Sequence, residues 1–271
     1  MSDSAALVEV VNLTKEFAPD GRERTRAIDD VNFAIRRGET FGLAGMSGSG
    51  KSVIGRIILN LMKPTSGEVR FDRTSVTGLS RREMAGFRTR MQMVFQNPLA
   101  ALNPRKTAGS SLELPLINFG IGSARERKER IAYLLDLVGL SPRHAQYYPH
   151  EFSGGQCQRV GIARALSSDP DFIFLDEPVS ALDVSIQAQM LNLLKDLQEK
   201  FGLTYLFVAN NLNVLYFISD RVGVLHRGKV LEIQETEDLF RAPQNATTRE
   251  LLSAMVLYGG RKPAAARTDA R

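Results

Sequence analysis

The sequence predicts an α/β protein with a mainly parallel sheet, a small β lobe before it and a helical lobe inserted into it. Three observations predict this fold. A glycine-rich turn at residues 45–52 lies between a short apolar strand and an apolar-periodic helix, a second apolar strand at 172–175 ends in two carboxylates, and strands alternate with helices from residue 171 onward. Alternation of this kind is typical of a parallel sheet covered by helices.

The first third of the chain is expected to form the β lobe and to begin the sheet. A polar loop with a turn at Asp20-Gly21 separates the first two strands, and a turn at residues 64–67 precedes the fourth. A helix over 53–61 follows the glycine-rich turn, and a charged helix is expected to begin at Ser80. The strands are expected at residues 6–12, 26–35, 40–44, 68–71 and 91–95.

A helical lobe is expected over residues 97–165. Its first part, 97–105, is rich in Pro, Asn and small residues, and helical patterns with loops follow. One helix carries an apolar stripe that we interpret as core: Ile131, Leu134, Leu135, Leu137 and Val138. Strands then return at 171–175, 204–208, 221–225 and 229–233. We expect one domain over residues 6–256 and a disordered tail over 257–271.

The glycine-rich turn meets every fixed position of the phosphate-binding pattern G-x-x-x-x-G-K-[ST]. Glycines let the backbone curl around an anion so that N–H groups and the helix N-terminus point at phosphate oxygens. We expect Lys51 to contact the β and γ phosphates and the Ser52 hydroxyl to bind Mg²⁺. A chance match in an ordinary turn is the alternative. The residues of the motif are Gly45, Met46, Ser47, Gly48, Ser49, Gly50, Lys51 and Ser52.

Two carboxylates, Asp176 and Glu177, follow the apolar strand 172–175. Ligands of open α/β sheets bind at the carboxyl ends of the strands, where this pair is expected. Asp176 would hold Mg²⁺ and Glu177 would polarise the attacking water. An acidic pair of this kind is often only a solvated turn, but a nucleotide site nearby favours the functional interpretation.

A second anion-binding turn, Ser153-Gly154-Gly155-Gln156, follows Phe152 and opens a helix over 157–166. With this segment the chain resembles the ATP-binding subunits of ABC transporters, whose signature reads Leu-Ser-Gly-Gly-Gln. The resemblance implies a P-loop NTPase core of the ABC ATPase type. In that family two subunits close face to face, and each ATP lies between the P-loop of one and the signature of the other.

The resemblance extends from about residue 7 to 256 and implies further roles. Gln96 matches the glutamine that contacts Mg²⁺ and senses the γ-phosphate, so that Ser52, Gln96 and Asp176 form the metal site. Phe17 matches the aromatic residue that stacks on adenine, although it could equally pack within the β lobe. Residues 180–183 match the loop that couples the two sites. The implied cofactors are ATP and Mg²⁺.

Residues 95–105 and 247–254 are similar to segments of the dipeptide, oligopeptide, nickel and opine importers. This subfamily implies a subunit that binds and hydrolyses ATP to power uptake of peptides or a similar small solute. It also implies a peripheral location on the cytoplasmic face of the inner (plasma) membrane. The implied partners are a second ATP-binding subunit, two membrane permease subunits and, indirectly, an extracytoplasmic solute-binding protein.

The chain departs from the family where a histidine and an aspartate should follow the strand 204–209. Asn210 and Asn211 stand there instead. Asparagine can donate a hydrogen bond to phosphate but cannot become a cation. Two interpretations remain open: Asn210 replaces the switch histidine geometrically, or the chain is a hydrolysis-impaired ATP-binding partner in a heterodimer.

The composition is ordinary for a globular protein, with 43% hydrophobic and 24% charged residues among 271. The start of the chain does not resemble a signal peptide, and no apolar run approaches the roughly 18 residues of a membrane span. The net charge of +5 permits a rival, an ABC-type ATPase acting on nucleic acid. Neither heptads nor a repeat support that rival, so no nucleic-acid partner is expected.

The single cysteine, Cys157, excludes an internal disulfide or a cysteine cluster. Because a helix N-terminus lowers a thiol pKa, Cys157 is either sensitive to oxidation or simply a tolerated small residue. His144, His150 and His226 lack the spacing of metal ligands, and we assign them no metal role.

Overall fold

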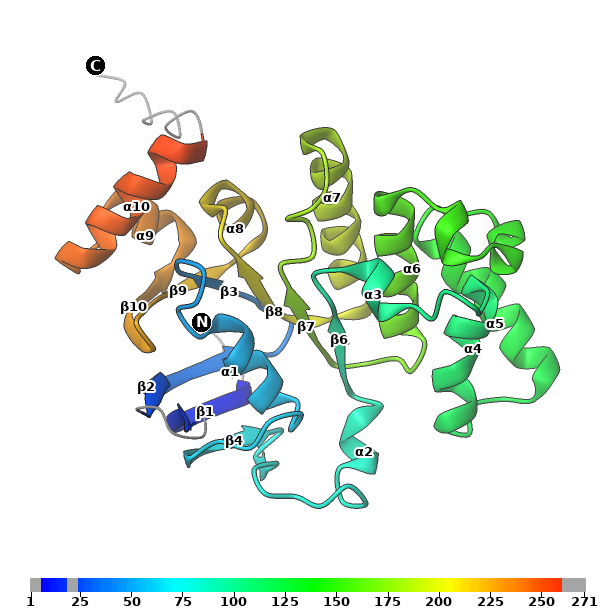
Figure 1. Cartoon of the computed structure of the whole chain (residues 1–271), viewed down its shortest axis with the longest axis horizontal. Helices are drawn as coiled ribbons and strands as arrows, with labels where there is room; N and C mark the ends of the chain where they lie inside the picture. Colours follow the sequence, from blue (N-terminus) through cyan, green and yellow to red (C-terminus); the bar gives the residue numbers. More distant parts are fainter. Residues whose placement is uncertain (1–5, 19–23, 260–271) are drawn as a thin grey trace.

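The structure is a computed structural model that describes residues 6–18 and 24–259, with side chains to Ser253. Its strands form two sheets (Figure 1). The predicted turn at Asp20-Gly21 lies outside the described residues. The smaller, antiparallel sheet has the order β2-β1-β4-β5, formed by Thr25–Arg36, Ala6–Phe17, Ser66–Phe71 and Thr74–Ser75.

The larger sheet has the order β10-β9-β3-β8-β7-β6. Strands β9, β3, β8, β7 and β6 are parallel, and β10 pairs with β9 in the antiparallel sense. The predicted α/β class is therefore confirmed. In the same order, these strands are Lys229–Glu235, Arg221–His226, Thr40–Ala44, Thr204–Ala209, Phe172–Asp176 and Met91–Val94.

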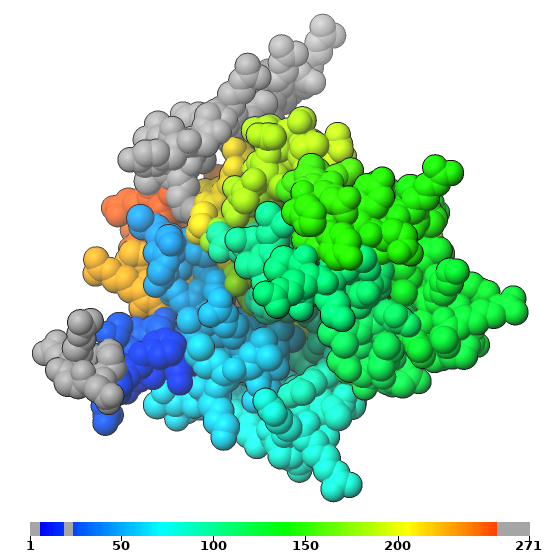
Figure 2. Space-filling model, turned by 45° about the vertical axis from the view of Figure 1, so that its right-hand side comes forward, coloured from blue at the N-terminus to red at the C-terminus, as the bar shows by residue number. Residues whose placement is uncertain are grey.

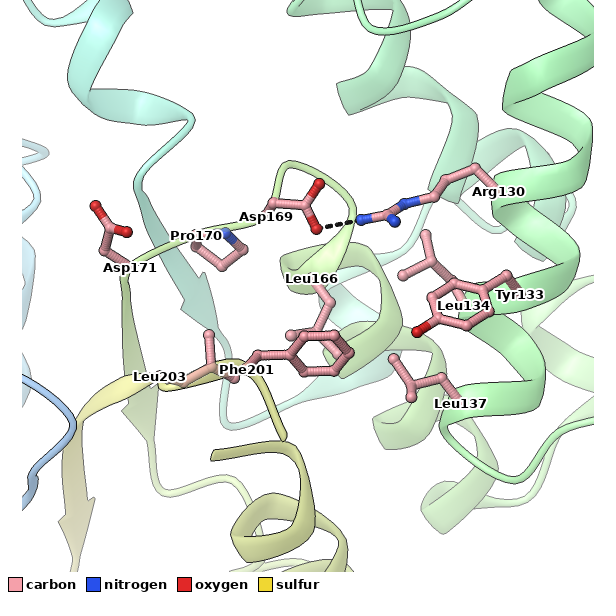
Figure 3. A pocket seen from close by; sticks show the side chains of 10 residues that line it. All are labelled: Arg130, Tyr133, Leu134, Leu137, Leu166, Asp169, Pro170, Asp171, Phe201 and Leu203. Carbon is pink, nitrogen blue, oxygen red and sulfur yellow. Dashed lines mark hydrogen bonds and ion pairs between the residues drawn. The ribbon is translucent and has the colours of Figure 1, made fainter. Parts of the chain in front are cut away.

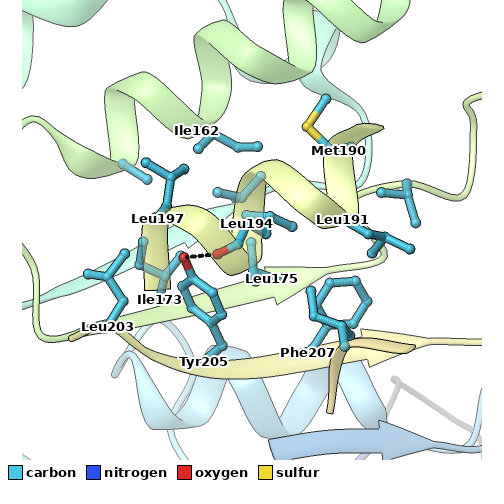
Figure 4. Packing of buried hydrophobic residues seen from close by; sticks show 14 of the residues in the cluster. Ile162, Ile173, Leu175, Met190, Leu191, Leu194, Leu197, Leu203, Tyr205 and Phe207 are labelled. Carbon is cyan, nitrogen blue, oxygen red and sulfur yellow. Dashed lines mark hydrogen bonds between the residues drawn. The ribbon is translucent and has the colours of Figure 1, made fainter. Parts of the chain in front are cut away.

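Alternate residues of the central strands face opposite sides of the sheet, so both faces need apolar cover. On one face, Phe172 and Phe174 belong to the core cluster that contains Ile54 of helix α1 (Lys51–Ile58). On the other face, helix α7 (Val184–Phe201) lies over Leu175 and its neighbours in the sheet, as Figure 4 shows. Helices on both faces leave the carboxyl edge of the sheet as the exposed place for a site.

A group of helices lies between β6 and β7, and we refer to it as the helical lobe. It consists of α3 (Pro98–Ala101), α4 (Ala108–Asn118), α5 (Ala124–Leu137), two short 3₁₀ helices (Pro142–Gln146 and Pro149–Glu151) and α6 (Gly154–Leu166). Four residues of the predicted apolar stripe are buried and Leu137 is partly buried. In the space-filling view this green lobe and the blue-to-cyan β lobe occupy different sides of the surface (Figure 2).

The charged helix expected from Ser80 is only partly formed. Residues 81–84 are a turn, and α2 covers just Ala85–Arg88. The Ser80 and Glu83 side chains do form reciprocal cap bonds with each other's backbone N–H groups. Met84 is the one buried apolar residue of this segment, so little packing supports a longer helix. The glycine at position 86 also lowers the helix propensity.

The carboxyl-terminal part contributes three helices, of which the first packs against β3 and β8 and the other two pack against β10. These are α8 (Leu212–Ile218), α9 (Thr236–Arg241) and α10 (Ala246–Gly259). Helix α10 includes residues 257–259, which were assigned to the expected tail, and residues 260–271 lie outside the described part. Within the described residues, every helix is too short or too polar to cross a membrane.

Candidate nucleotide site

The glycine-rich turn joins the end of β3 to the start of α1, as predicted, and close backbone packing explains two of its glycines. A Cβ on Gly45 would lie 2.4 Å from the Leu225 carbonyl oxygen. Gly50 has a φ of 107°, and a Cβ there would lie 2.5 Å from the Ala27 carbonyl oxygen. Larger residues would therefore push the turn away from β9 and β2.

Lys51 is buried in this turn. Its ammonium donates to the carbonyl oxygens of Gly45 and Met46 at 2.7 and 2.9 Å. Burial lowers the pKa of Lys51, and the negative charges of Glu177 and Asp176 oppose that effect. The cation is thus held beside the turn and faces the acidic pair.

The turn fits an anionic phosphate chain. The Ser49 hydroxyl oxygen is buried without a hydrogen-bond partner in the described structure. Gly50, the N-cap of α1, has no side chain to satisfy the first N–H groups of the helix. A buried cation, an unpaired hydroxyl and uncapped N–H groups together form a donor set for an anion.

Ser52 and Asp176 meet at the carboxyl end of β7. The Ser52 hydroxyl donates to the Asp176 carboxylate at 2.6 Å, and Asp176 is buried. A hydroxyl and a carboxylate oxygen are ligands that suit Mg²⁺. Gln96, the third predicted ligand, does not bond to this pair. Its amide instead donates to Glu177 at 3.2 Å and to Ser180 at 3.5 Å.

Glu177 lies at the centre of a hydrogen-bonded group. One carboxylate oxygen accepts from the Gln96 amide, and the other accepts from the Asn210 amide at 2.6 Å. Its backbone N–H donates to the Val208 carbonyl at 3.0 Å, which ties the end of β7 to β8. Because β6, β7 and β8 are parallel neighbours, the residues that follow them meet at one edge of the sheet.

Sequence reasoning missed one contact of this group. Ser180, interpreted only as part of the coupling loop, donates its hydroxyl to the Glu177 carbonyl at 3.1 Å and also contacts Gln96. A serine three residues after a strand-end glutamate is a local turn pattern that could have indicated the contact.

The second glycine turn caps α6. The Ser153 hydroxyl accepts from the Gln156 N–H at 3.2 Å, and the Gln156 side chain accepts from the Ser153 N–H at 3.0 Å. A Cβ on Gly155 would lie 2.7 Å from Ile186 of α7, whereas one on Gly154 would meet only Leu182, at 3.8 Å. The turn therefore packs beside the predicted coupling loop. In Figure 1, α6 and α1 lie on opposite sides of β7 and β8.

Phe17 ends β1 with 38% of its surface exposed, and the Lys15 ammonium lies 5.1 Å from the centre of its ring. An exposed ring can stack on a base. Both interpretations made from the sequence, adenine stacking and β-lobe packing, therefore stay open.

Cys157 differs from one of the two expectations. Its thiol is fully buried and lies 3.4 Å from the Pro149 carbonyl oxygen, to which it donates. Burial raises the pKa of the Cys157 thiol. A buried thiol with a raised pKa carries little thiolate and is shielded from oxidants, which contradicts the oxidation-sensitive interpretation and favours a small core residue.

The strand-turn-helix around Lys51, the Ser52–Asp176 pair at the end of β7 and Glu177 directly after it define a P-loop nucleotide-binding protein. A family model described as "ABC transporter" matches residues 28–180. The chain belongs to the ABC transporter family, as an ATP-binding subunit and ATPase of the cassette type.

Relatives and solved structures agree with this assignment. A putative peptide import ATP-binding protein of Brucella ovis is 54% identical over 92% of this chain and 78% of its own length. The oligopeptide transport ATP-binding protein OppF of Bacillus subtilis is 49% identical over 93% of this chain and 83% of its own. The resemblance to peptide-type importer subunits is thereby confirmed.

Among solved structures, the dimeric ATP-binding cassette MJ0796 in a post-hydrolysis state with ADP and Pi is 38% identical, with a TM-score of 0.77. The match covers 84% of this chain and 98% of that one. The predicted ABC ATPase fold is therefore confirmed.

Proposed function

We propose that this chain binds and hydrolyses ATP to power the import of peptides or a similar small solute. The names of the relatives, which refer to peptide and oligopeptide import, support this substrate class. In this proposal the chain is a peripheral subunit on the cytoplasmic face of the inner membrane. It works with two permease subunits and a second ATP-binding subunit, and an extracytoplasmic protein delivers the solute.

One observation carries the proposal: Ser52, Asp176 and Glu177 converge on the turn that buries Lys51. In this arrangement Lys51 and the N–H groups of the turn bind the β and γ phosphates. The Ser52 hydroxyl and the Asp176 carboxylate hold Mg²⁺, which neutralises phosphate charge when bound. Gln96 joins this metal group by leaving its present bonds with Glu177 and Ser180.

Glu177 is the proposed base. It takes a proton from the attacking water as the new O–P bond forms and the bond between the γ-phosphorus and the bridging oxygen breaks. The Gln96 and Asn210 amides, one on each carboxylate oxygen, orient the base. Phe17 supplies a ring for the adenine.

The signature of this chain, Ser153 to Gln156, is proposed to act on ATP bound to the partner subunit. Its position beside the loop 180–183 supports coupling between the two sites, because Gly155 packs against Ile186 just after that loop. Each composite site then takes its P-loop from one chain and its signature from the other.

The permease is proposed to bind at α3 and α4. Leu99, Leu114 and Ile117 are apolar and at least half exposed there, with 50%, 57% and 51% of their surfaces accessible. Exposed apolar groups of this size mark interaction surfaces when several occur together. Both helices pack on α6, which begins at the signature, so this surface is mechanically linked to the partner's site.

A second candidate function, a hydrolysis-impaired partner in a heterodimer, is favoured by Asn210. A neutral amide cannot supply the positive charge that a protonated histidine offers to the γ-phosphate. In this alternative the chain holds ATP to close the dimer, and the partner's site hydrolyses it.

The test uses the complex with its permease subunits in proteoliposomes, and measures uptake of a labelled tripeptide together with ATP hydrolysis. We expect uptake that requires ATP and is lost in Lys51→Ala. ATP hydrolysis without any peptide-dependent uptake or stimulation would reject peptide import, whereas absence of nucleotide binding by the wild type would reject the site itself.

A further inference from the structure

A cavity of about 140 Å³ lies between the helical lobe and the sheet (Figure 3). It is surrounded by helix α5, by the segment that joins α6 to β7, and by the end of α7 together with the start of β8. We call it the seam cavity. Strands β7 and β8 begin beside it, whereas Asp176 and Asn210 lie at their far ends. The five residues of β7, about 16 Å of strand, separate it from the nucleotide site.

Leucine side chains line the inner wall of the seam cavity, whereas Arg130, Asp169 and Asp171 supply the charged part of its lining. Leu134, Leu166 and Leu203 are almost completely buried, and Leu137 contributes a further partly buried side chain. A protein cavity of about 150 Å³ lined by such residues holds one benzene molecule. The volume of the seam cavity therefore suits one six-membered ring or one branched alkyl group.

Two aromatic rings flank the opening. Tyr133 and Phe201 lie on facing sides of the cavity in Figure 3, with 42% and 40% of their surfaces exposed. The Lys200 ammonium lies 5.7 Å from the Tyr133 ring centre and 5.5 Å from that of Phe201. The Lys200 ammonium thus lies beside both rings, and the Arg130 guanidinium, which lines the cavity, also lies 5.7 Å from the Tyr133 ring centre.

The opening also carries a carboxylate. Asp169 pairs with Arg130, yet 72% of its side chain is exposed and a carboxylate has about four acceptor positions. In the part of the chain that the structure describes, Lys200 forms no ion pair. The opening therefore offers the Lys200 cation, and the acceptor positions of Asp169 that Arg130 leaves free, next to a leucine-lined wall.

We propose that the seam cavity binds a free apolar α-amino acid such as leucine or phenylalanine. The side chain fills the leucine-lined interior, the carboxylate pairs with Lys200, and the ammonium group pairs with Asp169. A simple fatty acid or alkylamine satisfies only one of the two charged groups. The ligand contacts α5 on one side and the β7 and β8 ends on the other, so it binds the lobe and the sheet together.

The binding test uses the full chain without nucleotide, so its outcome does not depend on the proposed transport function. Leucine, glycine, 4-methylpentanoate and 3-methylbutylamine are titrated by calorimetry and ligand-observed NMR. We expect glycine to bind roughly 10- to 100-fold more weakly than leucine, because it leaves the apolar interior empty. Equal binding of leucine and glycine, or of leucine and either singly charged analogue, overturns the proposal, as does absence of leucine binding.

Two variants locate the binding. Lys200→Gln and Asp169→Asn each remove one charge, and asparagine tolerates the positive φ of 51° at position 169. We expect each to weaken leucine binding about fivefold, the effect of one partly exposed ion pair, without changing ATP affinity. Lys195→Gln is the matched control, because Lys195 belongs to the same helix but does not line the cavity. Its ammonium instead lies 4.3 Å from the centre of the Phe217 ring. Unchanged affinity in Lys200→Gln, or an equal loss in Lys195→Gln, shows that leucine binds elsewhere.

Discussion

The Asn210 side-chain amide donates to the Glu177 carboxylate at 2.6 Å, and the Gln96 amide donates to the other oxygen of the same carboxylate at 3.2 Å. Two neutral amides therefore hold the proposed base between them. Neither amide titrates in the physiological range, so the orientation of Glu177 does not change with pH through these partners. The departure from the family at position 210 thus acts on the glutamate as well as on any bound phosphate.

The first prediction concerns Asn210→His. A histidine can become a cation near pH 6.5 and can place that charge on the γ-phosphate. If the asparagine limits hydrolysis, this variant should raise the ATPase rate, by up to on the order of 10², the cost of a lost preorganised donor. It should also introduce a pH dependence near 6.5 that the wild type lacks. Steady-state ATPase of the complex from pH 5.5 to 8.5 measures both, and an unchanged rate and profile would mean that asparagine serves adequately.

The second prediction is that the two composite sites of a heterodimer are unequal. Gly154→Asp places a carboxylate against ATP bound to the partner, and the nearest atom to the new Cβ is Leu182 Cδ2 at 3.8 Å, so the fold accommodates it. In such a heterodimer, Glu177→Gln would affect only the site built on this chain's own P-loop, which we expect to be the slower one. We expect Gly154→Asp to reduce the ATPase of the complex far more than Glu177→Gln does. Equal losses from the two variants would indicate that both sites hydrolyse ATP.

The third prediction is that Lys51→Ala greatly weakens ATP binding. The variant removes a buried cation that the turn holds beside its own carbonyl groups. Charge-assisted hydrogen bonds contribute about 1.5–3 kcal/mol each, so ATP affinity should fall roughly 10- to 150-fold. Titration calorimetry measures the affinity for ATP, and circular dichroism checks that the substitution leaves the domain folded. Undiminished affinity in a folded variant would reject the P-loop assignment.

The fourth prediction concerns the permease surface. Charge reversal at Arg105, combined with a bulky residue at Ala101, should abolish transport while ATP binding stays intact. A bulky residue at Ala101 could also disturb the fold, because Ala101 is half-buried and its carbonyl accepts from Arg164 at 2.6 Å. We therefore combine Arg105→Glu with Leu99→Asp as well, since Leu99 is exposed. Co-purification with the permease and peptide uptake are the measurements. Normal assembly and uptake would show that the permease binds another surface.

The fifth prediction follows from the raised pKa and complete burial of Cys157. A thiol whose pKa is raised has less reactive thiolate at a given pH, and the native fold also blocks reagents. At pH 8 the native chain should react with a thiol reagent at least tenfold more slowly than the chain in guanidinium. The ratio should persist with rising pH until the protein unfolds. Rapid labelling of the folded chain would contradict the assignment of Cys157 to the core.

The sequence alone predicted the features that depend on neighbouring residues. The turn at 45–52 and the α6 cap at Ser153 lie within single segments, and backbone geometry and capping are local effects. The strands β3 and β7 were equally clear, because parallel strands buried on both faces are apolar throughout. Helix propensity and charge pattern were less reliable guides where few apolar residues are buried. The charged helix expected from Ser80 is shortened to α2 for this reason.

Only the tertiary structure decided which groups meet. Asn210 and Glu177 are 33 residues apart, and Gln96 and Glu177 are 81 apart, yet all three converge because β6, β7 and β8 are adjacent and parallel. The same applies to Cys157, whose sequence position suggested a lowered pKa while burial raises it. Strand order and burial arise from packing between distant segments, and a pattern of neighbouring residues does not contain that information.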